Sequence, residues 1–224
     1  MTPKDYRDFG LYAKDLGIGS LNLHNYNRRI EDSLTPYILE ERSMNVTVMD
    51  VFSRLMMERI IWVAGEVNDS MSTVVQAQLM FLDSLDNNDI TMHIDSPGGS
   101  VKSGLSMVDV MDYINSDIRT INTGMAASMG SVLLGAGTKG KRSSLTFSRT
   151  MLHQSSGGAG GNIQDARITM MEWEKINDTL FDLLGSYCGK DRETVKKDAT
   201  RDLWLGAQEA LDYGIIDEIV KKKK

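Results

Sequence analysis

Short apolar runs alternate with longer amphipathic stretches in the middle of the chain. Arg59–Ala64 is a β-branched apolar run and Ile90–Ile94 alternates apolar with polar residues, so both are predicted strands. Between them, over Met71–Leu85, apolar residues recur every three or four positions, which predicts an amphipathic helix. A second helical pattern follows the turn at Asp95–Ser100, and Ile118–Thr123 predicts a third strand. This alternation favours an α/β fold with helices packed on a sheet.

The C-terminal third contains the longest helical pattern. It covers about residues 162–187, follows the glycine-rich stretch Ser155–Gly161, and has apolar side chains on more than one side. One side of such a helix can pack on its own domain while another binds a partner, so we expect an oligomer. A helix over Ala207–Tyr213, a capping glycine at Gly214 and a strand over Ile215–Val220 complete the predicted elements.

Composition and charge narrow the class of protein. The chain has 224 residues, of which 41% are hydrophobic and 25% charged, as in an ordinary globular protein. Its formal net charge of −6 argues against a nucleic-acid surface. Residues 1–35 show little periodicity and are interpreted as an arm or a processed leader. They lack the apolar core of a secretory signal, and no run is long enough to span a membrane, so we expect a cytoplasmic protein.

The single cysteine and the missing motifs limit the possible cofactors. Cys188 alone allows no internal disulfide and no multi-cysteine zinc site. No histidine lies near it in sequence, which favours an inert thiol over a nucleophile. Because no HExxH, paired CxxC or phosphate-binding GxxxxGK motif occurs, we expect no metal, and no nucleotide bound by this chain.

Two strand-to-helix junctions could carry chemistry. Ser128 stands among small residues at a sharp turn, as a nucleophilic serine would, with the amide of Met129 beside it. The stretch Asp95-Ser-Pro-Gly-Gly99 places unpaired N–H groups at a helix start, where they could bind a developing oxyanion. Each junction also has a simpler interpretation, a helix-capping serine for the first and a plain tight turn for the second.

A nucleophilic serine needs a general base, usually histidine. The chain has three histidines; His24 lies in the arm and His93 inside a predicted strand. His153 ends a strand immediately before the glycine-rich stretch, where a side chain can face a cleft, so it is the candidate base. An aspartate would orient the imidazole, and the pattern leaves both Asp198 and Asp202 open.

Five stretches carry a family resemblance. They are DVFSRLMMERIIWVAGEV (50–67), IDSPGGSV (94–101), GMAASMGSVLLGAGTKGKR (124–142), MLHQ (151–154) and ATRDLWLGAQEALDYGIIDEI (199–219). In this order they strongly resemble the ClpP family, the proteolytic subunits of the Clp protease. The resemblance implies a serine endopeptidase with Ser128 as nucleophile, His153 as general base and Asp202 as its carboxylate. It also implies that the amides of Gly99 and Met129 form the oxyanion hole.

The resemblance implies an architecture as well. The fold would be a crotonase-like spiral of ββα units with a protruding strand-helix handle at about 154–188. The N-terminal strand and axial loop would occupy 36–48, and the peptidase domain 49–224. Two heptameric rings would stack into a homo-oligomeric tetradecamer. A ring-shaped AAA+ Clp unfoldase would use ATP and feed in unfolded proteins, while this chain would bind no cofactor, no nucleic acid and no membrane.

Four positions depart from the family pattern. Ser155 stands where proline usually follows the His-Gln pair, which predicts a looser loop. Thr200 replaces an acidic residue that pairs between rings, and Thr91 and His93 replace aromatic residues of the unfoldase-docking pocket, so we expect altered contacts there.

Two other functions are compatible with parts of the pattern. A crotonase-type acyl-CoA enzyme would share the fold and the oxyanion turn, but it would not need Ser128, His153 and Asp202 together. A catalytically silent ring subunit would have no use for an intact set of the three.

Overall fold

The structure is a computed structural model that describes residues 37–42, 45–157 and 160–221. The chain divides into two compact units after Met57. In the first unit, β1 (Tyr37–Arg42) and β2 (Asn45–Asp50) pair as an antiparallel hairpin. The helix α3 (Val51–Met57) follows directly. The division of 36–48 into an N-terminal strand and an axial loop stays a prediction, and the arm at 1–35, with its histidine, lies outside the described residues.

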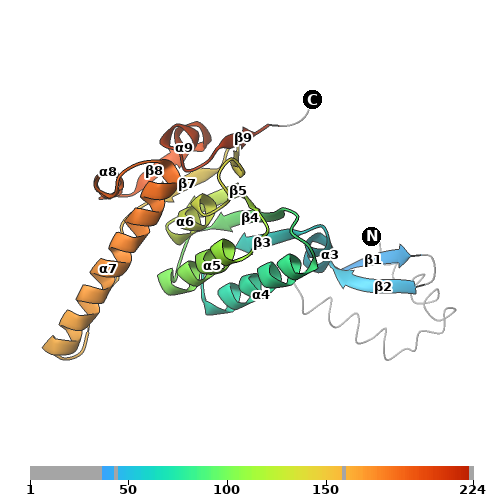
Figure 1. Ribbon diagram of the computed structural model, residues 1–224, viewed down its shortest axis with the longest axis horizontal. Helices are drawn as coiled ribbons and strands as arrows, with labels where there is room; N and C mark the ends of the chain where they lie inside the picture. The colour runs from blue at the N-terminus through green and yellow to red at the C-terminus, as the bar shows by residue number, and fades with distance from the viewer. Residues whose placement is uncertain (1–36, 43–44, 158–159, 222–224) are drawn as a thin grey trace, which may run out of the picture. The chain divides into compact units, whose positions relative to one another are not determined.

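The second unit is built on a seven-stranded, mostly parallel sheet (Figure 1). Its main path runs β3-β4-β5-β6-β9, while β7 pairs in parallel with β5 and antiparallel with β8. The strands are β3 (Ile60–Ala64), β4 (Ile90–Ser96), β5 (Ile118–Ala127), β6 (Arg142–Leu145), β7 (Arg149–Leu152), β8 (Leu203–Gly206) and β9 (Glu218–Val220). The parallel order follows from helical crossovers between strands, and it confirms the predicted α/β class.

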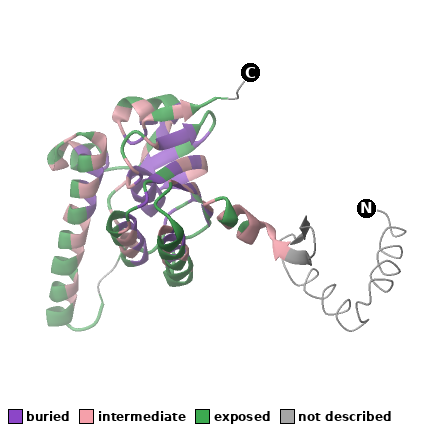
Figure 2. Cartoon of the chain, turned by 45° about the vertical axis from the view of Figure 1, so that its right-hand side comes forward, coloured by how far each residue is buried: buried purple, intermediate pink, exposed green. Residues whose placement is uncertain are grey.

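Helices cover the sheet and one of them extends well beyond it. They are α4 (Asp69–Leu85), α5 (Val101–Tyr113), α6 (Met129–Gly135), α7 (Ile163–Cys188), α8 (Arg192–Asp198) and α9 (Ala207–Tyr213). The helices α4 and α5 lie side by side, and the long α7 projects away from the sheet (Figure 1). The buried residues of α7 all fall between Leu180 and Gly185, and its other residues are exposed or half-buried in the single chain (Figure 2).

The core lies where the strands meet α4, α5 and α6. Along β4 the buried positions alternate with half-buried ones, so one face of the strand packs against the helices. The short α6 is buried along its whole length. Because α6 has no exposed side, other elements surround it, and they fix the position of its first residue, Met129.

The structure differs from the predicted strands most clearly at three places. The strand β5 extends four residues beyond Thr123, because Met125–Ala127 find a partner in β7. The strand expected within 155–161 is not formed by the described residues of that stretch, where the Ser155 amide bonds to a side chain and not to a neighbouring strand. The last strand begins at Glu218, since the two isoleucines after Gly214 are buried in the core.

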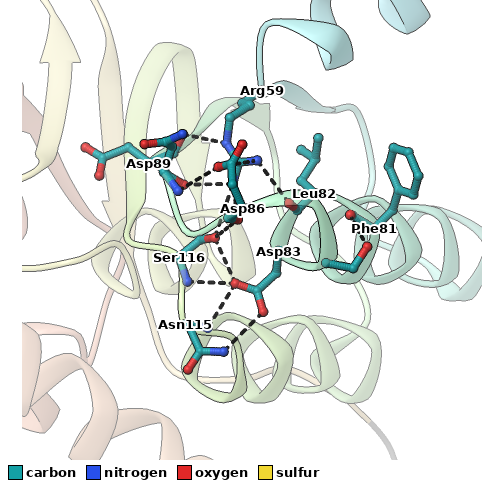
Figure 3. Close-up of polar contacts among 10 residues, drawn as sticks. Arg59, Phe81, Leu82, Asp83, Asp86, Asp89, Asn115 and Ser116 are labelled. Atoms are coloured by element: carbon teal, nitrogen blue, oxygen red, sulfur yellow. Dashed lines mark hydrogen bonds and ion pairs between the residues drawn. The ribbon is translucent and has the colours of Figure 1, made fainter.

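Arg59 joins the ends of three elements at one corner of the sheet. Its guanidinium donates to the carbonyl oxygens of Leu82 at 2.9 Å and Asn88 at 2.7 Å, and to the Ser116 hydroxyl at 3.1 Å. The carboxylate of Asp86 lies 3.1 Å away (Figure 3). Arg59 itself has a φ of 60°, which is unusual for a residue with a side chain. The local contacts therefore hold an unfavourable backbone conformation in place.

Asp83 completes this corner from the end of α4. Its carboxylate accepts hydrogen bonds from the Ser116 amide and hydroxyl, both at 2.8 Å, and from the Asn115 amide at 3.1 Å (Figure 3). The Ser116 hydroxyl is the main reason that the pKa of Asp83 lies below its ordinary value. The turn that follows α5 is thereby tied to α4, and the two helices keep a fixed spacing.

Replacing Arg59 by lysine should destabilise the fold. Lysine keeps the charge but loses the planar set of donors that reaches several carbonyl groups. We expect Arg59→Lys to lower the free energy of unfolding by about 2 kcal/mol, measured by urea titration at matched protein concentration. Arg192→Lys is the control, because Arg192 pairs with Asp182 on the surface. Equal losses in the two variants would contradict the structural role of Arg59.

Candidate active site

Ser128 occupies a strained turn between β5 and α6. Its φ is 53° and its ψ is −122°, and it is one of two non-glycine residues with positive φ in the described chain. Its hydroxyl makes no capping hydrogen bond to α6, so the helix-capping interpretation fails. Its backbone is held by the Ser128 amide, which donates to the Met151 carbonyl at 2.9 Å. Strain of this kind persists where surrounding structure enforces it, as it does at many active sites.

The glycine turn after β4 lies directly against this serine. A Cβ atom at Gly98 would lie 2.7 Å from the Ser128 Cβ and 2.9 Å from the Met129 nitrogen, and the φ of Gly98 is +94°. Space and backbone conformation therefore both require glycine at this position. The packing also brings the turn next to the first amide of α6.

Two amides at this junction are free to bind a ligand. Val67 pairs with the turn by donating to the Gly98 carbonyl and accepting from the Ser100 amide, both at 2.8 Å. This pairing leaves out the amide of Gly99. Within the described part of the chain, neither that amide nor the amide of Met129 donates a hydrogen bond. Two unpaired donors beside a strained serine can stabilise an oxyanion.

Strand register brings the candidate base and acid together. Leu152 at the end of β7 pairs with Leu203 at the start of β8 in an antiparallel ladder. The residues just beyond this pair, His153 and Asp202, are therefore adjacent in space. The Nδ1 atom of His153 lies 3.3 Å from the Asp202 Oδ1 atom.

The serine completes the line on the other side of the imidazole. Ala127 pairs with Met151 in the parallel ladder of β5 and β7, so Ser128 emerges beside the end of β7. The Nε2 atom of His153 and the Oγ atom of Ser128 are 2.8 Å apart. Three side chains that are far apart in sequence thus form one connected line.

The alternative aspartate lies elsewhere. Asp198 accepts a hydrogen bond from the Tyr213 hydroxyl at 3.1 Å. Geometry therefore separates the two aspartates that the sequence pattern left open, and it places Asp202 beside the imidazole.

A cavity of about 340 Å³ opens beside the glycine turn. It is lined by Gly99, Ser100, Val101, Lys102, Ser155, Ser156, Trp173 and Ile176. One wall comes from the turn and the start of α5, one from the residues after His153, and one from α7. Sequence reasoning missed the α7 wall, because apolar residues at helical spacing indicate a packed face and not a cavity.

The chain is similar to known proteins over nearly its whole length. A sequence model of the family described as Clp protease matches residues 42–223. The ATP-dependent Clp protease proteolytic subunit of Bacteroides fragilis is 50% identical over 218 residues, 96% of this chain and 99% of that protein. The proteins of the same name from Porphyromonas gingivalis and Ligilactobacillus salivarius are each 47% identical, covering 97% and 86% of this chain and 99% and 98% of their own lengths.

This chain belongs to the Clp protease family. Membership confirms the resemblance seen in the five sequence stretches and agrees with the mostly parallel sheet. Among the helices of the described residues, none has the length and apolar character that crossing a membrane requires.

The remaining candidates do not join this site. His93 stacks on Trp62 with ring centroids 4.7 Å apart, and its buried Nδ1 atom has no hydrogen-bond partner among the described residues. Burial lowers the pKa of His93, which favours the neutral ring. Cys188 ends α7, and burial raises the pKa of its thiol to about 11.

The thiol of Cys188 should react slowly at neutral pH. Since the thiolate is the reactive form, raising the pKa from 9.0 to about 11 lowers the thiolate fraction at pH 8 about 100-fold. We expect alkylation by iodoacetamide to be slower by this factor than in the urea-unfolded chain, which has the same single cysteine. The rate should rise with pH until about pH 11. Equal rates in folded and unfolded protein at pH 8 would contradict the burial of this group.

Proposed function

We propose that this chain is a serine endopeptidase that hydrolyses unfolded polypeptides inside a ring-shaped chamber, with Ser128, His153 and Asp202 as its catalytic residues. The connected line of these three side chains in a Clp protease family chain is the observation that carries the proposal. The reaction class is acyl transfer from a peptide bond to the serine and then to water.

His153 would act as the base in the first step. Its Nε2 atom, 2.8 Å from the serine, takes the proton as the Ser128 oxygen attacks the peptide carbonyl carbon. This requires the proton of the neutral ring to sit on Nδ1, the nitrogen that faces Asp202. The imidazolium then gives its proton to the leaving amine, and the C–N bond breaks. Water attacks the resulting ester with the same imidazole as base, and the serine is restored.

The two free amides would supply the electrostatic part of catalysis. The negative charge of the tetrahedral intermediate falls on the former carbonyl oxygen. The amides of Gly99 and Met129 can donate to it without reorganisation, because the glycine turn and α6 already hold them in place. Losing one such donor typically costs a factor of about 10² to 10³ in rate.

The neighbouring cavity would take a side chain of the substrate. Val101, Trp173 and Ile176 give it apolar walls, and it begins at Gly99, one of the proposed oxyanion donors. A side chain close to the scissile bond would therefore enter it. The chain's own groups and water suffice for this hydrolysis, so we propose that it uses no cofactor.

Assembly into two stacked heptameric rings forms part of the proposal. The exposed part of α7 carries apolar side chains that an isolated chain leaves in water: Ile163, Ile168, Met170 and Met171 are 50% to 76% exposed. Burial of such a stripe against a second copy is the usual solution. Thr200 is uncharged and supplies no carboxylate for a contact between rings. Its hydroxyl donates instead to the Lys196 carbonyl of its own chain at 3.0 Å.

A Clp unfoldase that uses ATP is the proposed partner. The relatives are named ATP-dependent, and this chain has no phosphate-binding motif, so a partner would use the nucleotide. A cavity of about 370 Å³ that includes Leu145, Phe147 and Val220 offers an apolar surface, and Phe147 is 93% exposed. We place the peptidase and its partner in the cytoplasm.

The two alternatives explain less of the site. A silent ring subunit leaves the strained Ser128 and its aligned imidazole without a use. A crotonase-type acyl-CoA enzyme needs the oxyanion turn but not the serine. Labelling with a fluorophosphonate, which reacts only with an activated serine, distinguishes both from the peptidase.

Ser128→Ala should abolish hydrolysis without disturbing assembly. The variant removes the nucleophile, so a fluorogenic peptide should not be cleaved and a fluorophosphonate should not label the protein. Its elution from a calibrated gel-filtration column should match that of the unmodified chain. Ser84→Ala, an exposed serine of α4, is the control and should keep full activity. Retained hydrolysis by a pure Ser128→Ala preparation would refute the assignment.

The two aspartates should differ sharply. Asp202→Asn removes the charge that holds the imidazole in the required tautomer, and we expect kcat to fall by a factor of up to about 10⁴. Asp198→Asn should change kcat less than threefold, because Asp198 faces Tyr213 instead. Steady-state hydrolysis of one peptide by the two variants decides the point, and a larger loss in Asp198→Asn would show that the carboxylate is misassigned.

A further inference from the structure

The two residues after His153 are each hydrogen-bonded to a different part of the chain. The Gln154 amide donates to the Ala199 carbonyl at 3.2 Å. The Ser155 amide and hydroxyl both donate to the side-chain oxygen of Asn177, each at 3.0 Å. The loose loop expected at this serine is therefore fastened to α7.

A second contact fastens the same stretch two residues later. A Cβ atom at Gly157 would lie only 1.0 Å from the Trp173 ring, so the Gly157 backbone lies directly against the indole. Trp173 and Asn177 are four residues apart in α7 and project from the same side of the helix. One face of α7 thus holds Ser155 by hydrogen bonds and Gly157 by contact with a ring.

These fastened residues form a wall of the cavity beside the active site. Ser155 and Ser156 line it on one side, and Trp173 and Ile176 line it on another. Asn177 is not among the lining residues, but it holds the first of these walls to the helix that carries the second. The separation of the two walls therefore depends on this asparagine.

We propose that Asn177 is a positioning residue for substrate selection: by accepting both hydrogen bonds from Ser155, it sets the width of the cavity that receives the substrate side chain. This inference rests on the proposed peptidase function and adds to it the residue that fixes the cavity. The substrate side chain concerned is a large apolar one, because the cavity holds about 340 Å³ and Val101, Trp173 and Ile176 line it.

Asn177 acts on binding and not on the chemical step. The Gln154 bond to Ala199 lies between His153 and the Asn177 contact, so the imidazole keeps its own anchor when Asn177 is changed. Ser128 is held by Met151 and by the glycine turn, which Asn177 does not touch. A loss at Asn177 should therefore appear in KM and should depend on the size of the substrate side chain.

The test compares two fluorogenic peptides that differ only in the residue before the scissile bond, phenylalanine or alanine. For Asn177→Ala we expect KM to rise about tenfold for the phenylalanine peptide, as loss of two hydrogen bonds warrants, and less than twofold for the alanine peptide. The kcat values and the pH profile of kcat should not change. Asn177→Asp keeps an acceptor oxygen and should restore most of the binding.

A double-mutant cycle shows whether Asn177 acts through Ser155. Ser155→Pro removes both donors, so adding Asn177→Ala to it should raise KM no further. Ser155→Ala keeps the backbone donor, so its KM should lie between those of the unmodified chain and Asn177→Ala. This comparison provides the same test if the proline variant folds poorly. An additive effect of Asn177→Ala in the proline variant would overturn the proposal, and so would equal KM changes for the two peptides.

Fluorophosphonate labelling separates this inference from the function beneath it. If the chain is not a serine peptidase, the unmodified protein neither labels nor cleaves either peptide. If only the role of Asn177 is wrong, the unmodified protein and Asn177→Ala label at the same rate, and the KM ratio of the two peptides is unchanged.

Discussion

The pairing of β7 with two different neighbours is the constraint on which the rest of the site depends. Its parallel ladder with β5 fixes where Ser128 emerges, and its antiparallel ladder with β8 fixes Asp202 beside His153. A shift of one residue in either ladder would turn the side chains to the opposite face of the sheet. The hydrogen bonds of the backbone thus position a serine, an imidazole and a carboxylate that are distant in sequence, and the core packing that stabilises the sheet also stabilises this arrangement.

The site is rigid where charge would develop and is fastened by polar contacts where substrate would bind. Near Ser128, close packing against Gly98 leaves no room for a side chain and holds two amides in place. Around the neighbouring cavity, hydrogen bonds from Ser155 to Asn177 hold one wall in position instead. Close packing is intolerant of change, whereas a hydrogen-bonded wall can be altered without moving the catalytic groups. Such an arrangement lets substrate preference vary while the chemistry stays the same.

Sequence patterns predicted the elements that have a strong period and missed the contacts that depend on tertiary structure. The helix over Met71–Leu85 was predicted from its regular apolar spacing and the strand over Arg59–Ala64 from its continuous apolar run; the structure has them at Asp69–Leu85 and Ile60–Ala64. Ser128 and His153 stood out because small residues and strand ends mark junctions. The local pattern left Asp198 and Asp202 open and the family resemblance implied Asp202, whereas the register of β7 and β8, which no local pattern encodes, explains why Asp202 lies beside His153. Asn177 was missed because a polar residue on a helix usually faces water, and its partner is 22 residues away.

The contact between Gly157 and Trp173 has a consequence for how this chain can diversify. A Cβ atom at 157 would lie 1.0 Å from the outer end of the indole, so a side chain at that position requires the Trp173 ring to turn aside or to be replaced by a smaller side chain. The two positions are therefore coupled, since a side chain at 157 and the indole at 173 compete for the same space.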